Sequence, residues 1–148
     1  MKKLIVIVLF ILKTFPSISY AESEAIYSLT IIVDEIRNSK GHIQFSLYNR
    51  NGSIPDENYE KYYTQKIGKI KNGSSSITFS NLPGGTYAVN ILHDENTNGK
   101  IDKGFILPIE GIGFTNFHSI GLINRPNFIK ASFELISNSI KNIKMIYF

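Results

Sequence analysis

The chain has 148 residues, of which 43% are hydrophobic and 19% are charged, and its formal net charge is +4. This length and hydrophobic fraction suit one domain with its own core and exclude an intrinsically disordered chain. The sequence contains no Cys, which excludes a disulfide scaffold, thiol catalysis, Cys-ligated zinc and a lipid anchor on Cys.

The N-terminus has the pattern of a secretory signal peptide. Two lysines precede the apolar run 4–12, and the small residues Ser19 and Ala21 follow it. At a rise of about 1.5 Å per residue this run spans only about half of the hydrocarbon layer, which disfavours a membrane anchor. We expect residues 1–21 to be a cleaved signal peptide. Residues 22–148 would then form one exported domain without a membrane span, either periplasmic or secreted.

The basic charge belongs mainly to this leader. Without Lys2, Lys3 and Lys13, the 16 Lys and Arg residues fall to 13, against 12 Asp and Glu residues. A protein that binds nucleic acid needs a surplus of basic residues on one face to displace counterions from phosphates. We therefore expect no nucleic-acid partner.

Two strands are predicted at the start of the exported domain, over residues 27–35 and 42–48. In each segment apolar residues alternate with polar ones, as in a strand that buries one face. Leu29 and Ile31 belong to the apolar row of the first strand. Because residues 37–41 between them favour a turn, we expect the two strands to form an antiparallel hairpin.

Further strands follow at intervals of about ten residues. They are rich in β-branched and aromatic residues, and no long helical periodicity interrupts them. The predicted strands are 64–71, 76–79, 86–92, 128–136 and 140–148. Residues 104–116 contain several glycines and are expected to form an ordered irregular loop in which backbone passes close to backbone. The sequence thus predicts an all-β domain of about seven or eight strands.

A rigid turn at residues 83–85 precedes Tyr87 at the start of a predicted strand. In Greek-key sandwiches a Tyr in this position covers the corner between the sheets and donates its hydroxyl to nearby backbone, forming a tyrosine corner. The alternative is a simple turn followed by a buried aromatic residue. We expect a Greek-key β-sandwich of immunoglobulin-like or transthyretin-like type.

The next segment, residues 93–102, resembles the first part of a calcium loop. Oxygen-bearing side chains fall at EF-hand positions 1, 3, 5 and 9, Gly99 takes position 6, and position 7 supplies a backbone carbonyl. Glu110 follows and is an additional candidate because the chain can fold back. The candidate ligands of a calcium ion are Asp94, Asn96, Asn98, Lys100 through its carbonyl, Asp102 and Glu110.

The loop does not belong to a true EF-hand, because Phe105 stands at position 12 in place of a bidentate Glu and no helices flank it. With so few carboxylates, we expect a weak dissociation constant, about 10⁻⁴ to 10⁻³ M. The alternative is an Asx-rich turn in which Asn and Asp side chains cap their own backbone without an ion.

Three motifs together resemble the bacterial domain-of-unknown-function family 2141. They lie at residues 82–89, which include Leu82, Pro83 and Tyr87, at residues 93–102, and at residues 108–116. The resemblance implies an exported bacterial protein of β-sandwich type, and it implies no particular activity.

No catalytic motif is recognised. The histidines His42, His93 and His118 fit no short zinc motif, and there is no nucleophile elbow and no phosphate loop. We expect a non-enzymatic, monomeric module of the bacterial cell envelope that is stabilised by structural calcium and binds a protein or glycan partner. Two alternatives stay open: a small metal-assisted hydrolase that uses Glu110 and His93, and an ion-free structural module.

Overall fold

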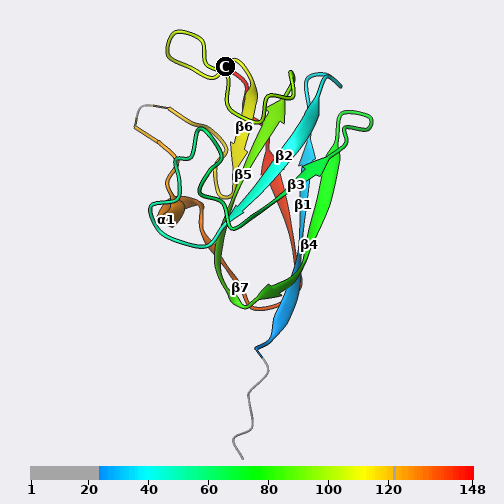
Figure 1. Ribbon diagram of the computed structural model, residues 1–148, viewed down its shortest axis with the longest axis vertical. Coiled ribbons are helices and arrows are strands. Elements are labelled where there is room, and N and C mark those ends of the chain that lie inside the picture. Colours follow the sequence, from blue (N-terminus) through cyan, green and yellow to red (C-terminus); the bar gives the residue numbers. More distant parts are fainter. Residues whose placement is uncertain (1–23, 122) are drawn as a thin grey trace, which may run out of the picture.

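A computed structural model of the chain describes residues 24–121 and 123–148 (Figure 1). The predicted signal peptide, residues 1–21, lies outside the described residues. The elements are β1 (Ile26–Asp34), β2 (His42–Tyr48), β3 (Thr64–Gly68), β4 (Ser75–Pro83), β5 (Gly85–Asp94), β6 (Gly111–Phe114), α1 (Phe128–Ala131), β7 (Phe133–Leu135) and β8 (Ser139–Lys144). The prediction of an all-β domain is confirmed.

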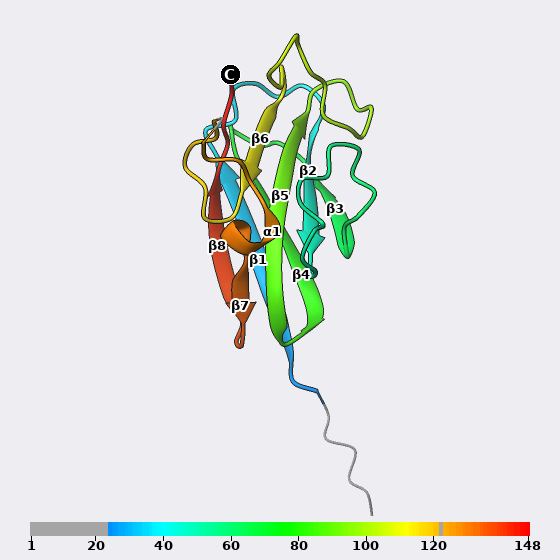
Figure 2. The same ribbon diagram turned by 90° about the vertical axis from the view of Figure 1, so that its left-hand side faces the viewer.

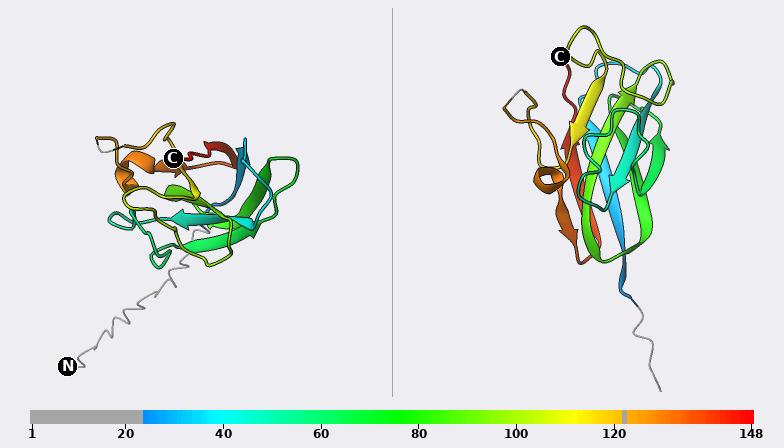
Figure 3. Two further views of the ribbon diagram at one scale, coloured as in Figure 1. Left: turned by 90° about the horizontal axis from the view of Figure 1, so that it is seen from above. Right: turned by 60° about the vertical axis from the view of Figure 1, so that its left-hand side comes forward.

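The strands form two sheets that face each other as two layers (Figure 3). The smaller sheet has the order β4-β1-β8, and the larger one has the order β3-β2-β5-β6, with β7 paired to the start of β5. The β1–β8 pair is parallel and the other strand pairs are antiparallel. In the described part of the chain, no helix is long and apolar enough to cross a membrane.

The prediction that the first two strands form a hairpin is wrong. β1 pairs with β4 and β8, whereas β2 pairs with β3 and β5, so residues 35–41 cross between the sheets. Alternation shows which side of a strand is buried but does not choose its neighbour, and Leu29 of β1 and Phe45 of β2 bury their side chains in one shared core. Gly41 ends the crossing with φ +61°, and a Cβ there would lie 1.8 Å from the Asp94 carbonyl oxygen.

The main core lies between the two sheets. The apolar row of β1 is fully buried, as predicted. The opposite row of the core comes from the inward faces of β2 and β5. The fully buried members of the main core as a whole are Leu29, Ile31, Val33, Ile43, Phe45, Leu47, Val89, Ile91 and Leu135. Every strand and every core residue falls within residues 26–148, so a chain of residues 22–148 contains the whole described fold.

The outward face of the larger sheet is covered as well. The side of β2 that the sequence marked as polar carries Gln44 and Ser46, which are 2% and 0% exposed. Residues of the 49–63 loop and of α1 pack over this face, and Figure 2 shows α1 in front of the sheet. This second cluster comprises Tyr48, Ile54, Tyr59, Ala88, Leu92, Ile112, Phe114, Phe117, Phe128 and Ala131. The central strands β2 and β5 are therefore buried on both faces.

Two elements differ from the prediction near the C-terminus. The strand predicted over 128–136 is interrupted, because the Asn127 side chain caps a short helix by accepting a hydrogen bond from the Lys130 amide (3.0 Å). The predicted loop 104–116 contains β6, a short strand in which two of four residues are Gly. A Cβ on Gly113 would lie 2.7 Å from the Lys144 carbonyl oxygen, which confirms the close backbone approach.

The chain passes from the smaller to the larger sheet at Gly84, between β4 and β5. Tyr87, only 4% exposed, donates its hydroxyl to the Pro83 carbonyl oxygen at 2.9 Å. The hydrogen bond expected of a tyrosine corner is therefore confirmed. It fixes the direction in which β5 leaves the turn, because it joins the first core side chain of β5 to the end of β4.

Replacing Tyr87 by Phe removes only this hydroxyl. We expect the free energy of unfolding, measured by urea denaturation of residues 22–148, to fall by about 0.5–1.5 kcal/mol. The matched control is Tyr62→Phe, because Tyr62 is 41% exposed. An equal effect of the two substitutions would show that the corner hydrogen bond adds nothing to stability.

Candidate functional site

The predicted ion loop starts where β5 ends, at Asp94, whose side chain is fully buried. The Asp94 carboxylate accepts hydrogen bonds from the backbone amides of Asn98 (3.1 Å) and Gly99 (2.8 Å). Thr97 and Gly99 both have left-handed backbone conformations, with φ +62° and +79°. The chain therefore curls around the Asp94 carboxylate, and Gly99 has the conformation for which its position in the motif predicted a glycine.

This curl brings the polar side chains of the loop together. Asn98 Nδ2 donates to Asp102 Oδ1 at 2.9 Å, and Asn96 Nδ2 donates to the other oxygen of the same carboxylate. Asn98 Oδ1 accepts a hydrogen bond from the Lys100 amide at 3.0 Å. Four of the six predicted ligands, Asp94, Asn96, Asn98 and Asp102, thus lie in one cluster, and Lys100 lies in the same turn.

The residue types of this cluster suit a hard cation such as calcium, which collects six to eight oxygen ligands. Within residues 24–121 and 123–148, no group of three His, Cys, Asp or Glu side chains is placed to hold a metal. Amide and carbonyl oxygens would therefore have to complete the shell around two carboxylates. The N–H groups of Asn96 and Asn98 now point at Asp102. A rotation of each amide group would present its oxygen instead.

Glu110, the sixth predicted ligand, holds the loop by its two ends. Its side chain accepts from the Glu95 amide through Oε1 (2.9 Å) and from the Asp102 amide through Oε2 (3.2 Å). Burial raises the pKa of Glu110 above its ordinary value, and the charges of Asp102 and Asp94 act in the same direction against the two backbone hydrogen bonds. Glu110 lies beside the cluster, and both of its oxygens are engaged by backbone.

A second set of contacts, which the sequence did not indicate, fastens the loop to the β1–β2 crossing. Arg37 Nε donates to Glu95 Oε1 at 2.7 Å, and Asn38 Nδ2 donates to Glu95 Oε2 at 3.1 Å. The Arg37 guanidinium also donates to the Ile109 carbonyl oxygen (2.8 Å) and lies 4.6 Å from the centre of the Tyr147 ring. Burial opposes ionisation of Glu95, but the hydrogen bonds from Asn38 and Arg37 and the Arg37 charge outweigh it and lower the Glu95 pKa.

His93 is fully buried, and both of its ring nitrogens are used. Its Nε2 lies 2.9 Å from the Lys40 carbonyl oxygen, which can only accept, so Nε2 carries the proton. In the neutral ring Nδ1 then accepts from the Tyr147 hydroxyl at 2.9 Å, and that hydroxyl accepts in turn from the Arg37 amide at 3.2 Å. His93 joins three distant segments of the chain, and neither nitrogen is available to a substrate in this arrangement.

Two buried tyrosines form a further polar group on the outward face of the larger sheet. Tyr48 donates its hydroxyl to Asp56 Oδ2 (3.0 Å), and Tyr59 donates to Asn90 Oδ1 (3.3 Å). Burial is the main cause that raises the pKa of both tyrosines, and the Asp56 charge adds to it. The sequence did not indicate this group, because it joins β2 and β5 to a loop that looked polar and solvated.

These observations define the class of protein as an all-β chain of two packed sheets with a polar loop at one end of the central strand. A bacterial family described as "Uncharacterized protein conserved in bacteria (DUF2141)" matches residues 31–144. The chain belongs to this family, which confirms the resemblance drawn from the motifs. No curated protein and no solved structure matches the chain significantly.

Replacing Glu110 by Gln puts an N–H group opposite a backbone N–H group, so one hydrogen bond to the loop is lost. We expect the free energy of unfolding to fall by about 1–3 kcal/mol. Amide hydrogen exchange at Glu95 or Asp102 should become faster. Glu57→Gln, which removes an exposed ion pair with Lys103, should cost about 0–1 kcal/mol. Unchanged exchange at both amides would refute the role assigned to Glu110.

The buried tyrosines predict a loss of stability in alkali. Tyr48 and Tyr59 have raised pKa values in the folded protein, so they stay protonated while the tyrosines of the unfolded chain ionise near pH 10. The contribution of these two tyrosines to the free energy of unfolding is fully present below about pH 10 and is lost as the pH rises further. Urea denaturation at increasing pH should show this fall, and Tyr48→Phe should make it shallower. An identical pH dependence in the variant would contradict the assignment.

Proposed function

We propose that this protein is an exported, non-enzymatic module of the bacterial cell envelope whose 94–102 loop binds a structural calcium ion. The observation that carries the calcium proposal is the convergence of Asp94, Asn96, Asn98 and Asp102 in one curled turn. In the proposed site these side chains and the Lys100 carbonyl supply the oxygens, and Glu110 keeps the two ends of the loop in place.

For the fold, we infer a Greek-key β-sandwich of immunoglobulin-like or transthyretin-like type. The hydrogen bond of Tyr87 at the corner and the repeated crossing of the chain between the two sheets support it. Export is supported by the leader pattern of residues 1–21.

The proposed binding surface is the apolar tip that follows the ion loop, residues 105–109. Phe105, Ile106 and Ile109 are 101%, 70% and 54% exposed. The tip is closed at its base by hydrogen bonds from the Gly104 amide to the Leu107 carbonyl (2.8 Å) and from the Ile109 amide to the Asp102 carbonyl (3.0 Å). Neighbouring exposed apolar side chains are typical of interaction sites. A calcium ion on Asp102 would stiffen this base, and the tip would contact an envelope protein or glycan.

The contacts of the loop also bear on the two alternative functions, a metal-assisted hydrolase and an ion-free structural module. A metal-assisted hydrolase needs an open coordination position in a cleft and a group free to move a proton. His93 is buried and hydrogen-bonded at both ring nitrogens, which favours a structural role over a catalytic one. The alternative of an ion-free module is supported by the side-chain N–H groups of Asn96 and Asn98, which already donate hydrogen bonds to the Asp102 carboxylate. A calcium titration distinguishes this module from the proposed one.

The test is thermal unfolding of residues 22–148 in chelator, in millimolar calcium and in millimolar magnesium. Calcium at ten times its dissociation constant stabilises the folded state by about 1.4 kcal/mol, which raises Tm by a few degrees. Asp102→Asn keeps the shape of the side chain but removes its charge, so the calcium shift should disappear. Thr97→Ala is the matched loop control, because the Thr97 hydroxyl donates only to the neighbouring Asn96 carbonyl.

A calcium shift that survives in Asp102→Asn would place the ion elsewhere. No shift in the unmodified protein at several millimolar calcium would reject the calcium proposal and favour the ion-free module. Magnesium is expected to have a smaller effect, because it dehydrates reluctantly and demands octahedral geometry.

A further inference from the structure

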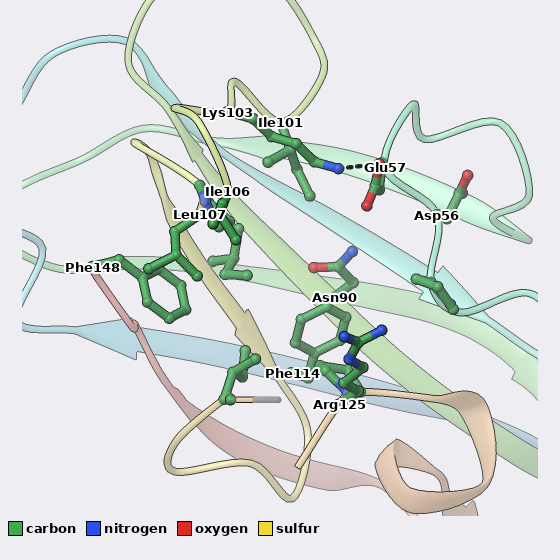
Figure 4. A pocket seen from close by; sticks show the side chains of 16 residues that line it. Asp56, Glu57, Asn90, Ile101, Lys103, Ile106, Leu107, Phe114, Arg125 and Phe148 are labelled. Atoms are coloured by element: carbon green, nitrogen blue, oxygen red, sulfur yellow. Dashed lines mark hydrogen bonds and ion pairs between the residues drawn. The ribbon is translucent and has the colours of Figure 1, made fainter. Parts of the chain in front are cut away.

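A pocket of about 540 Å³ opens on the outward face of the larger sheet (Figure 4). Its lining comes from the 55–57 segment, from β5 and β6, from the segment after the 94–102 loop, and from the segment before α1 through Ile120, Gly121, Arg125 and Pro126. Its walls are mainly apolar and include Ile101, Leu107, Phe114 and Phe148. The volume falls in the range of sites for small organic molecules, which combine apolar walls with a few polar groups.

The uncharged polar side chain in the described lining of the pocket is that of Asn90, from the middle of β5. Its side chain is 1% exposed, and its Oδ1 accepts the hydroxyl of Tyr59. Its Nδ2 has no hydrogen-bond partner among the described residues. Figure 4 shows the Asn90 amide among the side chains that line the pocket. A buried N–H group without a partner is costly, so an acceptor oxygen on a ligand would relieve this cost.

The charged residues that line the pocket indicate the charge of a ligand that would bind there. The Lys103 ammonium pairs with Glu57. The Asp56 carboxylate is engaged by the Tyr48 hydroxyl and by the backbone amides of Glu60 and Lys61.

Arg125 also lines the pocket, and among the described residues it forms no ion pair. The pocket therefore offers one cation and one N–H donor beside an apolar wall.

We propose that this pocket binds a small apolar carboxylate, such as a medium-chain alkanoate. One carboxylate oxygen accepts from Asn90 Nδ2, the guanidinium of Arg125 pairs with the negative charge, and the hydrocarbon chain lies against Ile101, Leu107 and Phe148. An apolar ligand without an acceptor leaves Asn90 unpaired, and a polar sugar makes poor use of the walls. The proposal does not depend on calcium.

The experiment is an NMR titration of ¹⁵N-labelled residues 22–148 with decanoate below its micelle concentration, in the presence of chelator. We expect a saturable shift of the Asn90 side-chain amide. Decanol, which has the same chain and no charge, should bind at least tenfold more weakly. Arg125→Ala should weaken decanoate binding about three- to tenfold, since one charge-assisted hydrogen bond is lost. Lys69→Ala removes an exposed cation outside this pocket and should change nothing.

A second variant separates the role of Asn90 from that of the apolar walls. Asn90→Asp keeps an oxygen for the Tyr59 hydroxyl but replaces the donor by a like charge, so decanoate binding should fall at least tenfold. If this variant does not fold, the comparison of decanoate with decanol and the Arg125→Ala result still test the proposal. Equal binding of decanol, no saturable shift at Asn90, or shifts confined to residues 105–109 would overturn it. Because chelator is present throughout, failure here leaves the calcium proposal unaffected.

Discussion

The structure depends on the burial of β5 on both of its faces. Val89 and Ile91 point into the core between the sheets, whereas Ala88 and Leu92 lie under the loops and the short helix on the other side. The strand pairs with β2 from Ala88 to Asp94, with β7 at its start and with β6 near its end. A strand held in this way is rigid, and the features with a functional interpretation lie at its start, its middle and its end.

Burial on two faces forces the polar groups of β5 to find partners inside the protein. His93 and Asp94 do so completely, the first through Lys40 and Tyr147 and the second through the loop amides that it organises. Among the described residues, only the oxygen of the Asn90 side chain has a hydrogen-bond partner. Within five residues of one strand, His93 is thus hydrogen-bonded at both ring nitrogens, whereas the Nδ2 of Asn90 has no partner among the described residues.

The end of the molecule that carries the 94–102 loop is tied together by contacts between distant segments. Glu110 bridges the two ends of the loop, and Glu95 receives Arg37 and Asn38 from the crossing between the sheets. The apolar tip and one wall of the pocket both continue from the same loop. A cation bound in the loop would therefore stiffen the tip and that wall together, which connects the two proposals without making either depend on the other.

The sequence by itself determined the all-β class, the buried row of β1, the corner at Tyr87 and the turn around Gly99, because each depends on residues close together in the chain. Tertiary structure decided the rest. The pairing of β1, the burial of the second face of β2 and the formation of the short strand β6 depend on which distant segments meet. The roles of Glu110, of Arg37 and of the unpaired Asn90 amide arise in the same way, since periodicity along one strand carries no information about the neighbour that covers it.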